Sequence, residues 1–79
     1  MDKIQKFLHK LSKKERAILF SIFADIQVLT LGGYDVKPLQ GHQGLFRLRK
    51  GQIRIVFAKL KSAGVIVNVA FRKDIYRDL

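Results

Sequence analysis

The chain has 79 residues, no cysteine and 48% hydrophobic residues, which predicts one small folded domain over residues 1–79 and excludes a disordered or disulfide-stapled protein. Sixteen Lys and Arg against six Asp and Glu give a formal charge of +10. A charge of this sign attracts phosphate backbones, anionic lipid or an acidic protein partner.

The first part of the sequence predicts two helices, over residues 2–10 and 13–30. Asp2 can cap the first helix, in which apolar residues recur at i, i+3, i+4 and i+7. That apolar stripe consists of Ile4, Phe7, Leu8 and Leu11. Ser12 and Glu15 open the second helix with the S-x-x-E pattern of a capping box. Together the two segments predict a helical hairpin.

The second predicted helix is apolar on two sides. The wide side consists of Ile18, Leu19, Ile22, Phe23, Ile26 and Leu29, and the second stripe consists of Phe20, Ala24 and Val28. We expect the wide side to cover a sheet, and the second stripe to pack against the first helix or to dock another chain. Gly32 and Gly33 predict the helix end, because glycine readily adopts the left-handed conformation found there.

Residues 34–44 include a proline and two glycines without periodicity and predict a connector. The strands and tail expected after it span residues 45–50, 52–60, 64–71 and 72–79. Turns at Lys50-Gly51 and near Gly64 join the three strands into an antiparallel meander. The predicted fold is therefore α+β, with the helical hairpin packed on one face of a three-stranded antiparallel sheet.

The turn expected between the first two strands pairs Arg47 with Arg54 and puts both on one sheet face with Arg49. Asn68 joins them from the third strand, and Arg72 follows at its end. The side chains expected on the other, helix-covered face are Phe46, Leu48, Ile53, Ile55, Phe57, Val67, Val69 and Phe71. Because facing arginines repel each other, the pattern indicates an anion between them. Arginines that fan out into water are the alternative.

The run Lys37 to Phe57, KPLQGHQGLFRLRKGQIRIVF, is followed by a valine-rich strand and by Arg72-Lys73-Asp74-Ile75-Tyr76-Arg77. This pattern resembles the RelE/ParE superfamily of toxin–antitoxin systems, on the RelE side. The resemblance covers residues 37–77, and the helical hairpin before them fits the same fold. It implies a RelE-like domain that lacks the usual first strand, because the first helix begins near residue 2.

The resemblance also implies an enzyme, a ribosome-dependent mRNA endonuclease that inhibits translation. In that chemistry the ribose 2′-hydroxyl attacks the adjacent phosphorus without a metal or cofactor. Arg54 and Arg72 match the family's phosphate-binding arginines, and Tyr76 matches its C-terminal tyrosine. Arg47 and Arg49 match positions that are often lysine. Guanidinium groups suit the charge that develops on the phosphate, but they are poor general bases, so the reaction would be slower or use another base.

The residues expected to act on RNA fall into two groups. The expected catalytic residues are Arg47, Arg54, Arg72 and Tyr76, and the expected RNA-binding residues are Arg49, Lys50, Asn68 and Lys73. Tyr76 would stack on a base and orient the hydroxyl, or it would pack as a tail aromatic on the sheet edge. His9 and His42 are expected on the solvated surface, and no metal site is predicted, since the acids do not cluster with other ligands.

Two other functions remain open at this point: a ParE-like inhibitor of DNA gyrase, and a non-catalytic basic domain that binds nucleic acid. The expected partners of a RelE-like toxin are a cognate acidic antitoxin, the ribosome and mRNA, with no membrane and no small-molecule cofactor. The N-terminal residues have no uninterrupted apolar core of the kind found in signal peptides, and no apolar stretch approaches the roughly 20 residues of a membrane span. We therefore expect a soluble protein in the cytoplasm.

Overall fold

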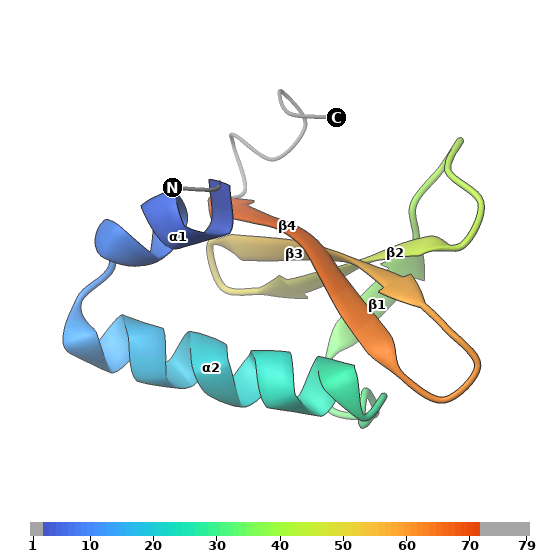
Figure 1. The fold of residues 1–79 in the computed structure, drawn as a ribbon, viewed down its shortest axis with the longest axis horizontal. Coiled ribbons are helices and arrows are strands. Elements are labelled where there is room, and N and C mark those ends of the chain that lie inside the picture. The colour runs from blue at the N-terminus through green and yellow to red at the C-terminus, as the bar shows by residue number, and fades with distance from the viewer. Residues whose placement is uncertain (1–2, 72–79) are drawn as a thin grey trace.

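A computed structural model describes residues 3–71 of the chain (Figure 1). Its elements in chain order are α1 (Lys3–His9), α2 (Lys13–Gln27), β1 (Asp35–Pro38), β2 (Leu45–Lys50), β3 (Ile53–Lys59) and β4 (Gly64–Phe71). The strands form one antiparallel sheet in the order β1-β2-β3-β4. The predicted α+β class is confirmed. The prediction of three strands was wrong, because the sheet has four.

The added strand is β1, in the segment expected to be a connector. It pairs with β2 from Asp35 opposite Arg49 to Pro38 opposite Phe46. The strand is four residues long and ends in proline, which has no N–H to donate and is tolerated in a sheet only at an edge or a strand end. A strand of four residues gives only a weak periodic signal in the sequence. Its pairing becomes evident only once β2 is in place.

The capping box predicted at the start of α2 is present. Glu15 N–H donates to Ser12 Oγ at 3.1 Å, and Ser12 N–H donates to Glu15 Oε1 at 2.9 Å. The backbone hydrogen bond to Ser12 is the main reason that the pKa of Glu15 lies below its usual value. The capping residue predicted for α1, Asp2, lies outside the described residues.

The C-terminal end of α2 comes at Gln27, before the expected residue 30 and before Gly32 and Gly33. Leu29 adopts the left-handed conformation, with φ of 57°. Leu29 N–H donates to Ile26 O at 3.0 Å, and Thr30 N–H donates to Asp25 O at 2.8 Å. These are the two hydrogen bonds of a Schellman motif. Leu29 replaces the expected glycine because its side chain packs against the core.

Both helices pack against one face of the sheet (Figure 1). The buried core consists of Phe7, Leu11, Leu19, Ile22, Ile26, Leu48, Ile55, Phe57 and Val69. The predicted stripe on α1 and most of the wide side of α2 are therefore confirmed, although Ile18 is 46% exposed. The second stripe of α2 does not pack against α1: Phe20 and Val28 are 52% and 68% exposed, and Ala24 is also exposed.

In residues 3–71, neither helix has the length and hydropathy of a membrane-spanning segment.

The hairpin between β2 and β3 has a different register from the one predicted. Its two loop residues are Gly51 and Gln52, so Arg49 lies opposite Arg54, and Lys50 lies opposite Ile53. Gly51 has φ of 58° and is the first loop residue, which is the glycine position of a type II′ turn. A loop at Lys50-Gly51 would have required the lysine at this position to adopt positive φ. The shift by two residues in the pairing leaves the assignment of each residue to a sheet face unchanged.

A bulge in β4 changes which of its residues face the core, compared with the prediction. Val56 pairs with Asn68, and the next residue, Phe57, pairs with Ile66, so Val67 is an extra residue in the ladder. The bulge reverses the alternation, and Ile66 packs against the core where Val67 was expected. Val67 is 46% exposed. Val69, beyond the bulge, is buried as predicted.

Gly64 allows the end of α2 to lie close to the start of β4. A Cβ atom on Gly64 would lie 2.3 Å from the backbone oxygen of Ile26 at the end of α2. We expect Gly64→Ala to lower the free energy of unfolding by about 1–3 kcal/mol, because backbone must move to admit the methyl group. Urea denaturation measures the change. Gly33→Ala is the control, since a Cβ atom there meets nothing within 4 Å. Equal stability of the two variants would contradict this packing.

The capping box makes stability depend on pH. Because the pKa of Glu15 is lowered from 4.5 in the folded chain, its ionised form stabilises the fold above that value, and this stabilisation is lost as the pH falls through the folded pKa. Glu15→Gln keeps a side chain that suits the box but removes the charge. We expect the stability advantage of wild type over Glu15→Gln in thermal unfolding to be largest above pH 4.5 and to shrink as the pH falls below that value. A constant difference would show that the carboxylate charge contributes nothing.

Candidate nucleic-acid interface

The sheet face opposite the helices carries a cluster of charged side chains from three adjacent strands. Cross-strand neighbours form two rows. The first row is Asp35, Arg49, Arg54 and Ala70, and the second is Lys37, Arg47, Val56 and Asn68. Directly opposed residues in antiparallel strands share a face. We call the charged members, Asp35, Lys37, Arg47, Arg49 and Arg54, the arginine face.

The three arginines differ in how much solvent they meet. Arg54, on the inner strand β3, is 8% exposed, whereas the side chains of Arg47 and Arg49 on β2 are 15% and 38% exposed. Lys37 on the edge strand is exposed. Arg47 and Arg54 therefore do not fan out into water, which was the alternative left open by the sequence. Charges in such partly buried places interact more strongly with a bound anion than surface charges do.

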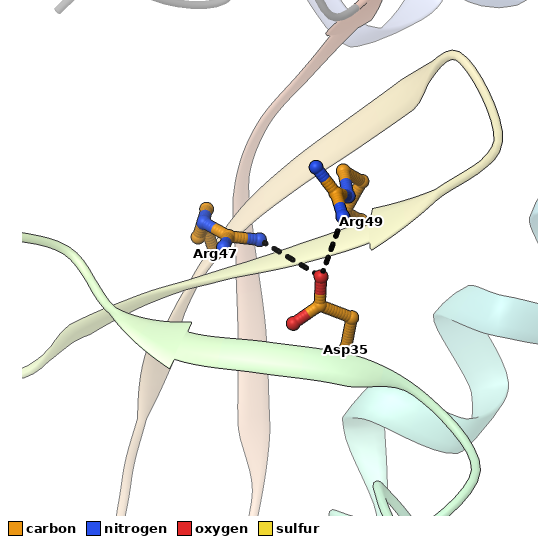
Figure 2. A network of polar contacts seen from close by, with 3 residues as sticks. All are labelled: Asp35, Arg47 and Arg49. Carbon is orange, nitrogen blue, oxygen red and sulfur yellow. Dashed lines mark ion pairs between the residues drawn. The ribbon is translucent and has the colours of Figure 1, made fainter.

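Asp35 lies between two of these arginines (Figure 2). Its Oδ2 atom is 3.2 Å from Arg49 Nη2 and 3.7 Å from Arg47 Nη1. The anion expected between the arginines is thus partly supplied by the chain itself. Sequence reasoning missed this carboxylate because the segment 34–44 was expected to be a connector. The alternating Asp35-Val36-Lys37 pattern beside an arginine-rich strand was the available signal.

The arginine face keeps donors for a further anion. Arg47 Nη1 is buried and makes no hydrogen bond within the part of the chain that the structure describes, since 3.7 Å to Asp35 is an ion-pair distance. Four cations and one carboxylate also leave the cluster with a positive charge. Guanidinium groups hold two phosphate oxygens at once when the fork faces them. The arrangement is therefore suited to a phosphate or phosphodiester.

Each of the two rows also contains an apolar side chain. Val56 and Ala70 are buried there, with Leu39 and Leu45 packed against them. Asn68 is also buried, at 6% exposure, and its Oδ1 accepts a hydrogen bond from Val69 N–H at 2.9 Å. This contact holds the Asn68 amide beside the bulge in β4. Asn68 thus lies on the face where it was expected, in the row of Arg47.

Tyr34 anchors the start of β1. Its hydroxyl donates a hydrogen bond to the carboxylate of Asp25 on α2, and this bond is the main reason that the pKa of Tyr34 is raised. The bond ties the residue before Asp35 to the second helix. It was not predicted, because Tyr34 was assigned to the connector.

Of the remaining predicted site residues, the structure describes only Lys50, which does not lie on the arginine face. Lys50 is exposed at the end of β2 and lies opposite Ile53, which packs against the core on the helix-covered face. Arg72, Lys73 and Tyr76 lie outside the described residues. His9 and His42 are exposed, as predicted. Among residues 3–71 no group of three or more His, Asp or Glu residues could hold a metal ion.

Comparisons with known proteins concern the fold. No model of a protein family matches the sequence, and no curated protein matches it. A chain in the crystal structure of the RelB-RelE antitoxin-toxin complex from Methanococcus jannaschii superimposes with a TM-score of 0.65 and 22% sequence identity. The alignment covers 94% of this chain and 89% of that chain. The two chains therefore share a fold over nearly their whole lengths.

Proposed function

We propose that this chain is the toxin of a toxin–antitoxin pair and that it cleaves mRNA on the ribosome. The observation that carries the proposal is the arginine face, where Arg47, Arg49 and Arg54 converge on the sheet surface that the helices leave uncovered. The shared fold with a chain of a RelB-RelE antitoxin-toxin complex supports a place in such a pair. The resemblance in residues 37–77 supports the endonuclease activity.

Within the pair, we assign this chain to the toxin because of its charge. A formal charge of +10 suits a phosphodiester substrate and an acidic partner that neutralises it. The exposed stripe of Phe20, Ala24 and Val28, along α2 and its C-cap, offers that partner an apolar contact. We expect the antitoxin to be an acidic chain that orders on binding and blocks access to the arginine face.

The proposed reaction is a transesterification within the RNA. The 2′-hydroxyl loses its proton as its oxygen forms a bond to phosphorus, the bond to the 5′-oxygen of the next nucleotide breaks, and that oxygen takes up a proton. The products carry a 2′,3′-cyclic phosphate and a 5′-hydroxyl. Negative charge increases on the non-bridging oxygens in the transition state. Arg47, Arg49 and Arg54 would stabilise that charge, since their donors are already oriented by the sheet. Tyr76, by resemblance, would orient the attacking hydroxyl.

A second candidate function is non-catalytic binding of nucleic acid. It is favoured by the chemistry of the arginine face: guanidinium groups stay protonated, and the carboxylate of Asp35 is paired with two of them. Neither is suited to remove a proton from the 2′-hydroxyl. The two candidates differ in one result, because a binder would retain RNA without breaking it.

We expect Arg47→Ala and Arg54→Ala each to reduce mRNA breaks on translating ribosomes by about 10²-fold, the usual effect of removing one oriented donor to a developing charge. Primer extension on the mRNA counts the breaks. Lys61→Ala, in the exposed turn before β4, removes the same charge elsewhere and should leave cleavage unchanged. Thermal unfolding verifies that each variant is folded. Cleavage at the wild-type rate by a folded Arg47→Ala variant would contradict the assignment of Arg47 to the site. A wild-type chain that binds RNA and makes no breaks would favour non-catalytic nucleic-acid binding.

A further inference from the structure

Asp35 lies closer to Arg49 than to Arg47, and it does not form a two-bond pair with either arginine. A single atom, Oδ2, serves both partners, at 3.2 Å to Arg49 Nη2 and at 3.7 Å to Arg47 Nη1 (Figure 2). Neither contact is the parallel two-bond fork that makes an arginine–carboxylate pair strong. Arg47 Nη1 is buried and has no hydrogen bond within the described residues. A phosphate, with more oxygens and more charge, could approach both guanidinium groups more closely than this carboxylate does.

The position of Asp35 allows its side chain to leave. Asp35 is the first residue of an edge strand that pairs with β2 alone, and its side chain is 37% exposed. The backbone just before it is held, because Tyr34 is hydrogen-bonded to Asp25. Departure therefore needs a side-chain rotation into solvent and no loss of strand pairing. Rotations of exposed side chains are fast, on a scale of about picoseconds to nanoseconds.

We propose that Asp35 is a built-in counter-ion of the arginine face, which occupies the place of a phosphate between Arg47 and Arg49 and is displaced when RNA binds. This inference rests on the proposed function only in taking the arginine face as the phosphate site. While the site is empty, the carboxylate reduces repulsion among the three arginines and stabilises the sheet. When a phosphodiester arrives, the same carboxylate competes with it. Asp35 thus lowers affinity and raises stability.

The two effects predict opposite signs for one substitution. Asp35→Asn should bind inorganic phosphate and a short single-stranded RNA about 2- to 5-fold more tightly, the range expected when a partly exposed ion pair no longer competes. The same variant should melt at a lower temperature than wild type in phosphate-free buffer. A residue that only orients the arginines would weaken binding and stability together. A spectator residue would change neither.

The experiment measures both quantities at one fixed ionic strength, because screening alters every charge effect. Isothermal titration with inorganic phosphate and fluorescence anisotropy with the RNA give the affinities, and thermal unfolding gives the stability. Glu15→Gln is the matched control: it adds the same charge on α2 while keeping a side chain that suits the capping box. We expect Glu15→Gln to bind phosphate as wild type does. Asp35→Glu, which restores the charge, should return affinity toward the wild-type value.

A measurement on the unmodified chain covers the case in which Asp35→Asn does not fold. The side-chain carboxyl carbon of Asp35 should shift in NMR spectra during titration with inorganic phosphate, as the carboxylate leaves the arginines. A carboxyl signal that stays fixed while phosphate binds would overturn the proposal. So would an Asp35→Asn variant that binds phosphate and RNA no more tightly than Glu15→Gln.

These outcomes distinguish the inference from the proposed function. Phosphate and RNA binding are measured without ribosomes or cleavage, so an inactive protein that binds more tightly as Asp35→Asn would support the inference alone. A wild-type chain that binds neither phosphate nor RNA would overturn both.

Discussion

Repulsion among Arg47, Arg49 and Arg54 is the electrostatic constraint on which the organisation of this small sheet depends. Arg49 lies directly opposite Arg54, and like charges that face each other across two strands destabilise a sheet. Asp35, on the neighbouring edge strand, reduces this repulsion because it forms ion pairs with Arg47 and Arg49. Among the residues that the structure describes, Asp35 therefore offsets part of the charge of Arg47 and Arg49. An anion of higher charge would be attracted to the same two guanidinium groups.

The other face of the sheet makes this arrangement possible. A chain of 79 residues has a thin margin of stability, so a sheet with one charged face requires a well-packed core on the opposite face. Two helices cover that side alone, with Phe57, Leu48 and Ile55 fully buried beneath them. The close approach of Ile26 to Gly64 brings α2 onto β4. Because the helices pack on one face only, the arginines lie together on the other.

The sequence predicted the features that arise from strong local patterns. The S-x-x-E pattern predicted the capping box at Ser12, and the helical period predicted the apolar stripes. The alternation of side chains along strands predicted that the arginines share one face. The structure has these features. Features that depend on tertiary contacts were not predicted from the sequence. Leu29 ends α2 because the core holds its side chain in place of a glycine cap, and β1 exists because β2 offers it a partner. Asp35 could not be assigned to the site without that strand. A bulge at Val67 left no pattern in the sequence.

The most direct test of the central claim, that the arginine face is the surface that binds RNA, is a titration of short single-stranded RNA into the isotope-labelled chain, followed by backbone and arginine side-chain NMR. We expect the largest shifts at Asp35, Arg47, Arg49 and Arg54, which line the two charged rows. The outer side of α2, marked by Phe20 and Val28, should change little, since it faces away from the core that separates it from the sheet. Shifts concentrated on α2, with the guanidinium signals unmoved, would contradict the claim.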